Sequence, residues 1–506
     1  MTISILQIGA ENWAPYITDK LDWHHTSVLD LPTFLAMQRD PYVLEQTYVL
    51  LTDDHLESTL LSSQINEWPA LRVIYFAHKV ASDFQKILDE RRAFRIEENT
   101  PENVEKRIVT DMDTSQYGFS TRFSAEQFIP YVPEGIHLQR QGDFSTQFEG
   151  EFGEDWQQLG TLKAGTSDFQ SGRANEVWLE YNHTEKAEPA LLFVFYKNGE
   201  VLTQQLIAGQ SLRQLTTVAP PEDYENYEIL VLGKGQGTLD FYVIHQRASR
   251  HGLGHLLPGG TWQLTKENEE VLSYFNPGDR QKPLIVSFAD TRLHVDGFEM
   301  QEALNRLGTP YLLFTDARVQ GGAFDIGTAE YEATIIRIIK QKMKTLGLRA
   351  EDLILMGASM GSYPALYYAA DLNPAAVVIA KPIVNLGTFT AGSTISRGFD
   401  YGWRLDVRRY LSGYVRPDDN VAMNEKLWKH IENTNWTNIK VALFSMSQDE
   451  YDGQSLGQLL DFFAKHNVPV KHESEEGQHT EKLDEMVDFM MTNLNVLQNT
   501  MRAEGE

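Results

Sequence analysis

Short apolar runs alternate with longer mixed segments in the first part of the chain, as in buried parallel strands joined by helices. The runs cover residues 3–8, 48–51 and 71–76, and a helix is predicted over 83–92. We therefore expect a small α/β domain at 1–134. A single glycine, Gly9, follows the first run instead of a G-x-G-x-x-G motif, so dinucleotide binding is not indicated.

A different pattern, of short alternating strands separated by turn signals, begins after Pro133. Strands are predicted at 177–181, 191–196, 229–232 and 239–245, and Asn198-Gly199 is typical of a hairpin turn. Regular spacing of this kind predicts a β-sandwich of the jelly-roll type at 135–250. Trp156 and Trp178 are candidates for sugar-stacking platforms, as in carbohydrate-binding modules, although tryptophans on alternating strands more often belong to a core.

Strand and helix alternate again beyond a glycine-rich stretch at 251–260. Strands are predicted at 284–288, 311–314, 353–357, 376–379, 440–445 and 468–473, and helices at 297–307, 331–346 and 480–497. This order predicts a mostly parallel, doubly wound, α/β-hydrolase-like sheet in a domain at 260–506. His251 and His255 lie in the glycine-rich stretch without a ligand cluster nearby, so we predict no metal site there.

A G-x-S-x-G motif, Gly357 to Gly361, falls between a predicted strand and a predicted helix. In such a nucleophile elbow Ser359 occupies a strained turn at the head of the sheet, where the glycines avoid collisions with neighbouring backbone. The N–H of Met360, at a helix N-terminus, would stabilise a developing oxyanion. These features predict acyl transfer.

A serine hydroxyl needs a base in contact and a carboxylate that orients the base, in the chain order Ser, Asp or Glu, His. The strand at 440–445 runs into Asp449, the favoured acid, with Glu450 and Asp452 as rivals. His479, in a glycine-containing loop after the last strand, is the predicted base. A second oxyanion donor is expected from a backbone N–H near Ala289 or Asp290, after the strand at 284–288.

Composition excludes several other classes of function. The chain has 506 residues, 44 basic and 71 acidic, and its net charge of −27 argues against a nucleic-acid surface or an electrostatic grip on anionic lipid. It contains no cysteine, which excludes disulfides, thiolate catalysis and cysteine-ligated metals. We see neither a signal-peptide pattern nor an apolar run long enough to span a membrane, so we expect a cytoplasmic protein.

Several of these motifs resemble a known family, the second accessory Sec protein of streptococci and staphylococci. The similar segments are 285–292, 295–299, 356–368, 448–452 and 477–479, and the rest of the chain is similar in length and domain order. The resemblance implies a cytoplasmic protein, with peripheral attachment to the membrane through the export machinery as an option. It also implies that the protein acts with two other accessory Sec proteins and the accessory Sec motor ATPase on serine-rich-repeat glycoprotein adhesins, whose N-acetylglucosamine it O-acetylates.

The resemblance also implies roles for single residues. Ser359 would carry the acetyl group, His479 would act as general base and acid, and Asp449 or Glu450 would orient it. The segment 392–414, between the predicted strands at 376–379 and 440–445, is rich in Arg and Tyr. Its basic and aromatic side chains either shape the acceptor site or only cap the fold, and the candidates are Arg397, Tyr401, Trp403 and Arg404. No tightly bound cofactor is expected, and the acyl donor, with acetyl-CoA as a candidate, is left open. A carbohydrate esterase and a non-catalytic export subunit are the alternatives.

Overall fold

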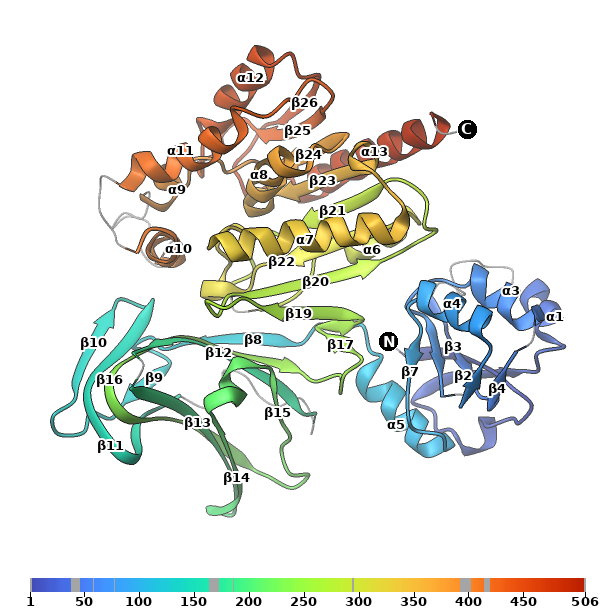
Figure 1. Ribbon diagram of the computed structural model, residues 1–506, viewed down its shortest axis with the longest axis horizontal. Helices are drawn as coiled ribbons and strands as arrows, with labels where there is room; N and C mark the ends of the chain where they lie inside the picture. Colours follow the sequence, from blue (N-terminus) through green and yellow to red (C-terminus); the bar gives the residue numbers. More distant parts are fainter. Residues whose placement is uncertain are drawn as a thin grey trace.

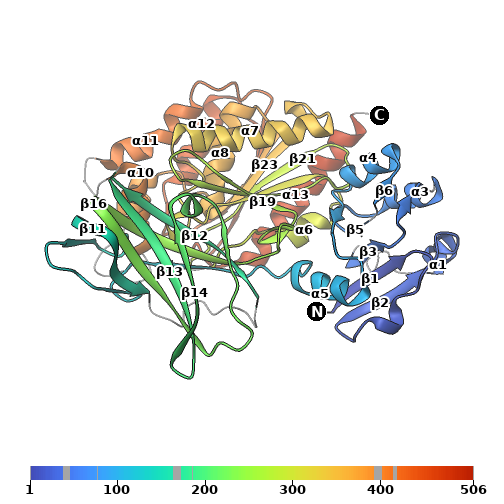
Figure 2. The same ribbon diagram turned by 60° about the horizontal axis from the view of Figure 1, so that its bottom comes forward.

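Three main sheets follow one another along the chain in the computed structural model (Figure 1). The structure describes residues 2–37, 46–57, 59–76, 78–162, 173–184, 186–293, 295–391, 402–413 and 419–504. The N-terminal sheet and the middle sheet lie at separate places against the C-terminal sheet (Figures 1 and 2). The limits 1–134, 135–250 and 260–506 remain a prediction of domain boundaries.

The N-terminal sheet is parallel throughout, with the order β2-β1-β3-β5-β7. Its strands are β1 (Ile3–Ile8), β2 (Leu21–Thr26), β3 (Tyr48–Leu51), β5 (Val73–Tyr75) and β7 (Phe94–Arg95). Beside it lie η1 (Ala14–Tyr16), α1 (Leu31–Met37), α3 (Thr59–Glu67), α4 (Ser82–Glu90), α5 (Pro101–Asp111) and the small pair β4 (His55–Leu56) and β6 (Lys79–Val80). The inner strands β3 and β5 are apolar without alternation because both of their faces are buried.

The middle sheet is antiparallel and is organised around one long strand, β16 (Asn226–Ala248). The strands β8, β11, β12 and β13 all pair with it. The other elements are β8 (Gly118–Arg122), β9 (Phe128–Pro130), β10 (His137–Gln141), β11 (Ser145–Leu162), β12 (Asn175–His183), β13 (Ala187–Lys197), β14 (Glu200–Ala208), η3 (Gly209–Arg213) and β15 (Thr216–Val218). Register shifts in β11 let the sheet bend around a core that includes Phe148, Phe193 and Phe241.

One predicted hairpin turn and one predicted break between strands lie in this sheet. The predicted hairpin at Asn198-Gly199 is confirmed, because both residues have positive φ, 52° and 77°, between β13 and β14. The predicted break between 229–232 and 239–245 is wrong, since β16 runs through it. A Cβ on Gly235 would lie 2.0 Å from the Lys186 carbonyl oxygen, so that glycine permits a close backbone approach within a strand instead of a turn.

The C-terminal sheet has the order β19-β20-β22-β21-β23-β24-β25-β26, and its described strands are parallel from β22 to β26. They are β19 (Gly260–Leu264), β20 (Glu270–Asn276), β21 (Leu284–Phe288), β22 (Tyr311–Thr315), β23 (Leu353–Ala358), β24 (Ala376–Ala380), β25 (Lys440–Met446) and β26 (Val470–Glu475). A short antiparallel pair, β17 (Gly254–His255) and β18 (Leu257–Pro258), precedes them. The predicted doubly wound α/β-hydrolase-like sheet is confirmed.

Helices cover both faces of this sheet. They are α6 (Gln301–Asn305), η4 (Arg318–Gln320), α7 (Ala329–Leu346), η5 (Ala350–Asp352), η6 (Ser359–Gly361), α8 (Ser362–Leu372), α9 (Leu386–Ala391), α10 (Gly402–Ser412), α11 (Asp419–Ile431), α12 (Ser455–Lys465) and α13 (Leu483–Ala503). The helix predicted at 297–307 begins only at 301, because Met300 has a left-handed φ of 64°. Among the described helices, none combines the length and apolar character that crossing a bilayer requires.

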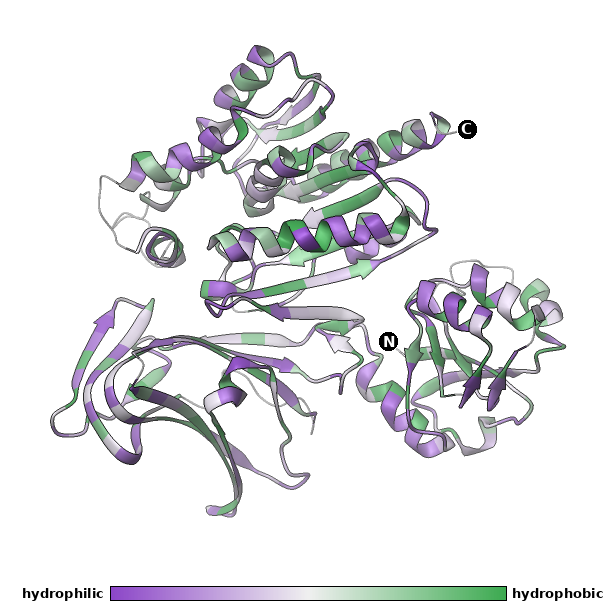
Figure 3. Cartoon of the chain, in the orientation of Figure 1, coloured by the Kyte–Doolittle hydropathy of each residue, from purple (hydrophilic) through white to green (hydrophobic). Residues whose placement is uncertain are grey.

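The two faces of the C-terminal sheet have separate cores. Leu353 and Leu355 of β23 pack in the cluster that contains α7, α8, α11 and α12, whereas Ile354 and Met356 face the other way, toward α13. This second cluster continues into Ile5 of the N-terminal sheet. Figure 3 shows the result: the central strands are hydrophobic along their length, while α7 alternates between apolar and polar positions.

A buried network of charged groups joins the middle sheet to the C-terminal sheet. Arg247 of β16 donates from Nη1 and Nη2 to both carboxylate oxygens of Glu270 on β20, at 2.7 and 2.6 Å, and from Nε to Asp296 at 2.7 Å. His245 contacts Asp296 through Nδ1 at 3.0 Å and Glu180 of β12 through Nε2 at 2.8 Å. All five side chains are buried. The network therefore fixes the two sheets against each other.

Candidate active site

Ser359 lies in a sharp turn at the carboxyl end of β23, in the middle of the C-terminal sheet. Its φ of 50° is left-handed, the strained conformation expected of a nucleophile elbow. A Cβ on Gly357 would lie 2.1 Å from the Gly361 carbonyl oxygen, and a Cβ on Gly361 would lie 2.2 Å from that of Phe288. The two glycines of the motif thus allow β23, the turn and β21 to pack closely.

We expect Gly361→Ala to lower the free energy of unfolding by about 1–3 kcal/mol, because the methyl group meets backbone that cannot rotate away. Gly457→Ala is the matched control. Gly457 lies in α12 with no atom within 4 Å of its added Cβ, so alanine there should be neutral or stabilise by up to about 1 kcal/mol. Urea titration of both variants measures the difference, and equal stabilities would contradict the close-approach explanation.

The three predicted catalytic side chains form one hydrogen-bonded line. Nε2 of His479 lies 2.9 Å from Oγ of Ser359, and Nδ1 of the same ring lies 2.8 Å from Oδ2 of Asp449. Asp449 follows β25 and His479 follows β26, so neighbouring strand ends bring them together. Burial alone would raise the pKa of Asp449, but the hydrogen bond and charge of His479 bring that pKa below its ordinary value. The carboxylate is therefore ionised beside the imidazole.

The rival carboxylates have other partners. Oε2 of Glu450 accepts the backbone N–H of His479 at 3.0 Å and has no contact with the imidazole in the described structure. Asp452 accepts the N–H groups of Val384 and Asn385, both at 2.8 Å, and so holds the loop after β24. Geometry therefore assigns the ring contact to Asp449, among the three acids that the sequence left open.

The predicted oxyanion donors are all close to the elbow, but they are not all free to bind a ligand. The N–H of Ala289 donates to the carbonyl of Phe314 at 3.1 Å within the sheet, and the N–H of Asp290 donates to Oε2 of Glu299 at 2.9 Å. The N–H of Met360 faces the position beside Ser359 and donates to Oδ1 of Asp290 at 3.3 Å. A side chain, the carboxyl group of Asp290, thus occupies the place where sequence reasoning expected a backbone donor.

A stack of aromatic and basic side chains, which includes two of the candidates named from the sequence, packs against the predicted base. The ring of Tyr451 lies parallel to that of His479 with 4.1 Å between centroids. The guanidinium of Arg404, from α10, lies 4.2 Å from the centres of both the Tyr451 and Phe389 rings. Trp403 packs edge-on against Phe389 at 5.7 Å. Of the four candidates named from the segment 392–414, Arg397 and Tyr401 lie outside the described residues.

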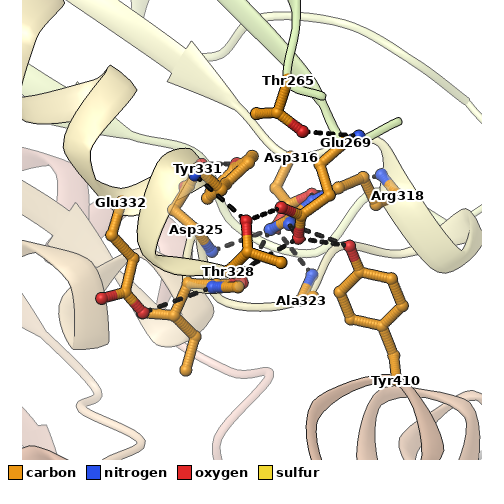
Figure 4. Close-up of polar contacts among 12 residues, drawn as sticks. Thr265, Glu269, Asp316, Arg318, Ala323, Asp325, Thr328, Tyr331, Glu332 and Tyr410 are labelled. Atoms are coloured by element: carbon orange, nitrogen blue, oxygen red, sulfur yellow. Dashed lines mark hydrogen bonds and ion pairs between the residues drawn. The ribbon is translucent and has the colours of Figure 1, made fainter. Parts of the chain in front are cut away.

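A buried polar network holds the loop after β22 (Figure 4). Asp316 accepts N–H groups of the loop, including that of Ala323 at 2.8 Å, and pairs with Arg318 at 2.7 Å. Tyr410 of α10 donates to Glu269 at 2.8 Å, which also pairs with Arg318 at 3.1 Å. Within the same loop, a Cβ on Gly322 would lie 2.5 Å from the Met360 side chain, so the loop packs closely against the residue whose N–H is the predicted oxyanion donor.

The remaining candidate residues lie outside this site. Trp178 is buried and packs against Trp262 at 5.4 Å, as expected of a core residue, whereas Trp156 is partly exposed with Lys234 over its ring at 4.8 Å. His251 and His255 each pair with a carboxylate, of Asp111 and Glu176.

One group of described residues could hold a metal ion by its spacing alone: Glu180, His245 and Glu270, whose ligand atoms lie within 4.8 Å of one another. The ring of His245 already bonds to Glu180 at 2.8 Å and to Asp296 at 3.0 Å, and both carboxylate oxygens of Glu270 accept from Arg247, at 2.7 and 2.6 Å. The positive charge of Arg247 competes with a cation, and we interpret the group as an ion-pair network.

Comparison with known proteins places the chain in a family. A family model described as the accessory Sec system GspB-transporter matches residues 3–502. An accessory Sec system protein of Staphylococcus aureus is 30% identical over 360 residues, 71% of this chain and 69% of that protein. One of Streptococcus gordonii is 25% identical over 509 residues, 97% of this chain and 96% of that protein.

A solved structure with the same fold over almost the whole chain is a chain of the Glycosylation Associate Protein (Gap123) complex from Streptococcus agalactiae. Its TM-score is 0.83, its identity 26%, and the match covers 97% of each chain. These findings confirm the family resemblance drawn from the motifs. The chain therefore belongs to the accessory Sec system GspB-transporter family.

Proposed function

We propose that this protein is a serine-dependent O-acetyltransferase that acetylates N-acetylglucosamine on serine-rich-repeat glycoprotein adhesins and supports their export within the accessory Sec system. The observation that carries the enzymatic part is the line from Ser359 through His479 to Asp449, with contacts of 2.9 and 2.8 Å, at a strained elbow. The export part rests on membership of the accessory Sec family.

The proposed reaction has two steps at Ser359. In the first, Oγ bonds to the acetyl carbon while Nε2 of His479 takes the hydroxyl proton, and collapse of the tetrahedral intermediate passes that proton to the leaving group. In the second, a sugar hydroxyl gives its proton to His479 and attacks the acetyl-enzyme, and Ser359 regains a proton. A hydrolase would use water in this second step. We propose acetyl-CoA as the donor, since its thioester is an activated acetyl group.

We further propose a cytoplasmic site of action, with two other accessory Sec proteins and the accessory Sec motor ATPase as partners. The similarity to a chain of the Gap123 complex supports assembly with other proteins. The glycosylated adhesin would be both the acetyl acceptor and the exported cargo, so one subunit would modify and escort it.

Mass spectrometry of adhesin glycans from cells carrying Ser359→Ala tests this proposal. We expect acetylated N-acetylglucosamine to disappear, because the nucleophile is lost while the buried site changes by one oxygen atom. Ser63→Ala, at an exposed position on α3, is the matched control and should leave acetylation unchanged. Increased acetylation in Ser359→Ala would identify a carbohydrate esterase. A non-catalytic export subunit would be identified by unchanged acetylation together with loss of export on deletion of the protein.

A further inference from the structure

A cavity of about 560 Å³ lies between the N-terminal sheet and the C-terminal sheet. Its walls come from the start of β3, the ends of α3 and α4, the helix α6, and the edge where β20 ends and β22 begins. Ser359 follows the carboxyl end of β23, whereas the cavity lies at the amino end of β22, which runs in the same direction. A strand of this length spans roughly 16 Å, so the cavity is separate from the candidate active site. Its volume is that of a small-molecule site.

Two arginines in this cavity have no acidic partner among the described residues. The Arg72 guanidinium lies over the Tyr48 ring at 4.6 Å and makes no hydrogen bond or ion pair within the described part of the chain. Arg91 donates to the carbonyl oxygens of Trp68 and Gly278, both at 3.5 Å, and its Nε is buried without a partner there. Burial lowers the pKa of Arg91, so an anion beside it would be stabilising. In a chain with 44 basic and 71 acidic residues, two such cations favour an anionic ligand.

The acids of the cavity do not neutralise these cations. Glu67 and Asp279 also line it, and both side chains are exposed. Asp279 already pairs with Arg502 of α13 at 2.7 Å. Within the described ranges, neither acid forms an ion pair with Arg72 or Arg91. The two guanidinium groups therefore remain available to a ligand.

Aromatic side chains form the apolar part of the cavity, and contacts within the protein hold them in place. Tyr48 donates from its hydroxyl and Trp68 from Nε1 to backbone carbonyl oxygens, at 3.0 and 3.3 Å. The rings of Tyr274 and Tyr311 lie 6.1 Å apart between their centroids. Rings that are fixed before a ligand arrives can pack against the apolar faces of a sugar at little cost in conformational entropy.

Amide side chains supply hydrogen-bonding groups beside these rings. Oδ1 of Asn305 accepts from the Tyr311 hydroxyl at 2.6 Å and from Nδ2 of Asn276 at 3.3 Å. Nδ2 of Asn305 has no partner among the described residues and can donate to a ligand. Gln281 and Gln301 line the same cavity and add further donors and acceptors. Neutral amides beside aromatic rings suit a ligand that carries hydroxyl groups.

We propose that this cavity binds a sugar phosphate, with the phosphate at Arg72 and Arg91 and the sugar between the tyrosine rings and the Asn305 amide. The planar fork of a guanidinium matches two phosphate oxygens, which supplies the anionic half of the recognition. The ligand touches elements of both sheets and thereby joins the N-terminal sheet to the C-terminal sheet. This site does not depend on the proposed acyl transfer at Ser359.

Isothermal titration calorimetry of the full-length protein at low ionic strength tests the proposal with four probes. They are N-acetylglucosamine 1-phosphate, glucose 1-phosphate, N-acetylglucosamine and inorganic phosphate. We expect at least one sugar phosphate to bind with a Kd below about 1 mM. The free sugar and free phosphate should bind at least about tenfold more weakly, because each lacks half of the contacts. Added salt should weaken the binding of the sugar phosphate, since it screens the charges.

Two variants test the placement of the ligand. Arg72→Gln should raise the Kd of the sugar phosphate about 10–100-fold through loss of a charge-assisted contact. Arg349→Gln, the same exchange at an exposed position outside the cavity, is the matched control and should leave the Kd unchanged. In Asn305→Asp the carboxylate can still accept from Tyr311 and Asn276, but a negative charge replaces the free donor. Binding should therefore weaken at least about tenfold.

The proposal is overturned if neither sugar phosphate binds, or if inorganic phosphate binds as tightly, which would identify a site for a simple anion. Equal binding of the free sugar would overturn it as well, since the arginines would then contribute nothing. It also fails if folded Arg72→Gln and Asn305→Asp bind like the wild type. Ser359→Ala should bind the sugar phosphate as the wild type does, so failure of this proposal is measured separately from failure of the proposed acyl transfer.

Discussion

Asp449→Asn is expected to slow acylation of Ser359 by about four orders of magnitude, although the new side chain has the same shape. Asp449 accepts from Nδ1 of His479 at 2.8 Å, which leaves Nε2 without a proton and facing the Ser359 hydroxyl. An asparagine amide can donate to Nδ1 instead. The ring would then carry its proton on Nε2 and could not take one from serine. Pre-steady-state acylation rates of the purified variant measure the loss.

Glu450→Gln is the matched control for this prediction. Glu450 contacts only the backbone N–H of His479 in the described structure, and a glutamine oxygen can accept the same bond. We expect the rate constant for acylation of Ser359 to change by less than about tenfold, because only the charge on one hydrogen-bond acceptor is lost. If Glu450→Gln were slower than Asp449→Asn, Glu450 would be the orienting acid and the geometry described above would not be the working one.

Arg247→Met is expected to lower the free energy of unfolding by about 3–5 kcal/mol, the largest stability effect that we predict. The guanidinium makes a two-fold contact with Glu270 and a third contact with Asp296, and all three groups are buried. Methionine fills a similar volume but leaves Glu270 without its two-fold partner and Asp296 with His245 alone. Denaturant unfolding, followed for the middle and C-terminal sheets together, measures the change.

Arg349→Met provides the matched control, because Arg349 is exposed and its pair with Glu351 at 2.9 Å lies at the surface. That substitution should change stability by less than about 0.5 kcal/mol. Similar effects at Arg247 and Arg349 would contradict the structural role of the buried network.

The buried network should also make the stability of the protein depend on pH. Burial alone would lower the pKa of His245, but Asp296, Glu270 and Glu180 raise it to about 10. Because the folded-state pKa lies above the unfolded value, this histidine contributes its full stabilisation below about pH 6.5 and loses it as the pH rises toward 10. The free energy of unfolding of the wild-type protein should therefore fall across that interval. For this reason the stabilities of Arg247→Met and the wild type should be compared below about pH 6.5 as well as at alkaline pH.

The elbow and its partners were predictable because their signals are local. A glycine on each side of Ser359, a carboxylate after β25 and a histidine after β26 all follow strand ends, and parallel strands bring such ends to one edge. The apolar runs predicted β21 and β25 almost to the residue for the same reason. Hydrophobic periodicity records burial, and these strands are buried on both faces.

Other features depend on contacts between distant segments, which no local pattern records. Asp290 was predicted to act through its N–H, but Glu299 takes that group and the side chain turns to Met360. The stack of Arg404 and Tyr451 on His479 joins α10 to two later loops. The strands predicted at 229–232 and 239–245 are one strand, β16, because Gly235 permits a close approach of the Lys186 segment that no local pattern records.

The measurement that tests the central claim most directly is the mass of the peptide that contains Ser359 after brief exposure of the protein to an activated acetyl ester and acid quenching. We predict one added acetyl group on Ser359 in the wild-type protein, slow appearance of that group in Asp449→Asn, and its absence in Ser359→Ala. Acetylation that bypasses Ser359, or a wild-type peptide that stays unmodified while the ester is consumed, would contradict acyl transfer through this serine.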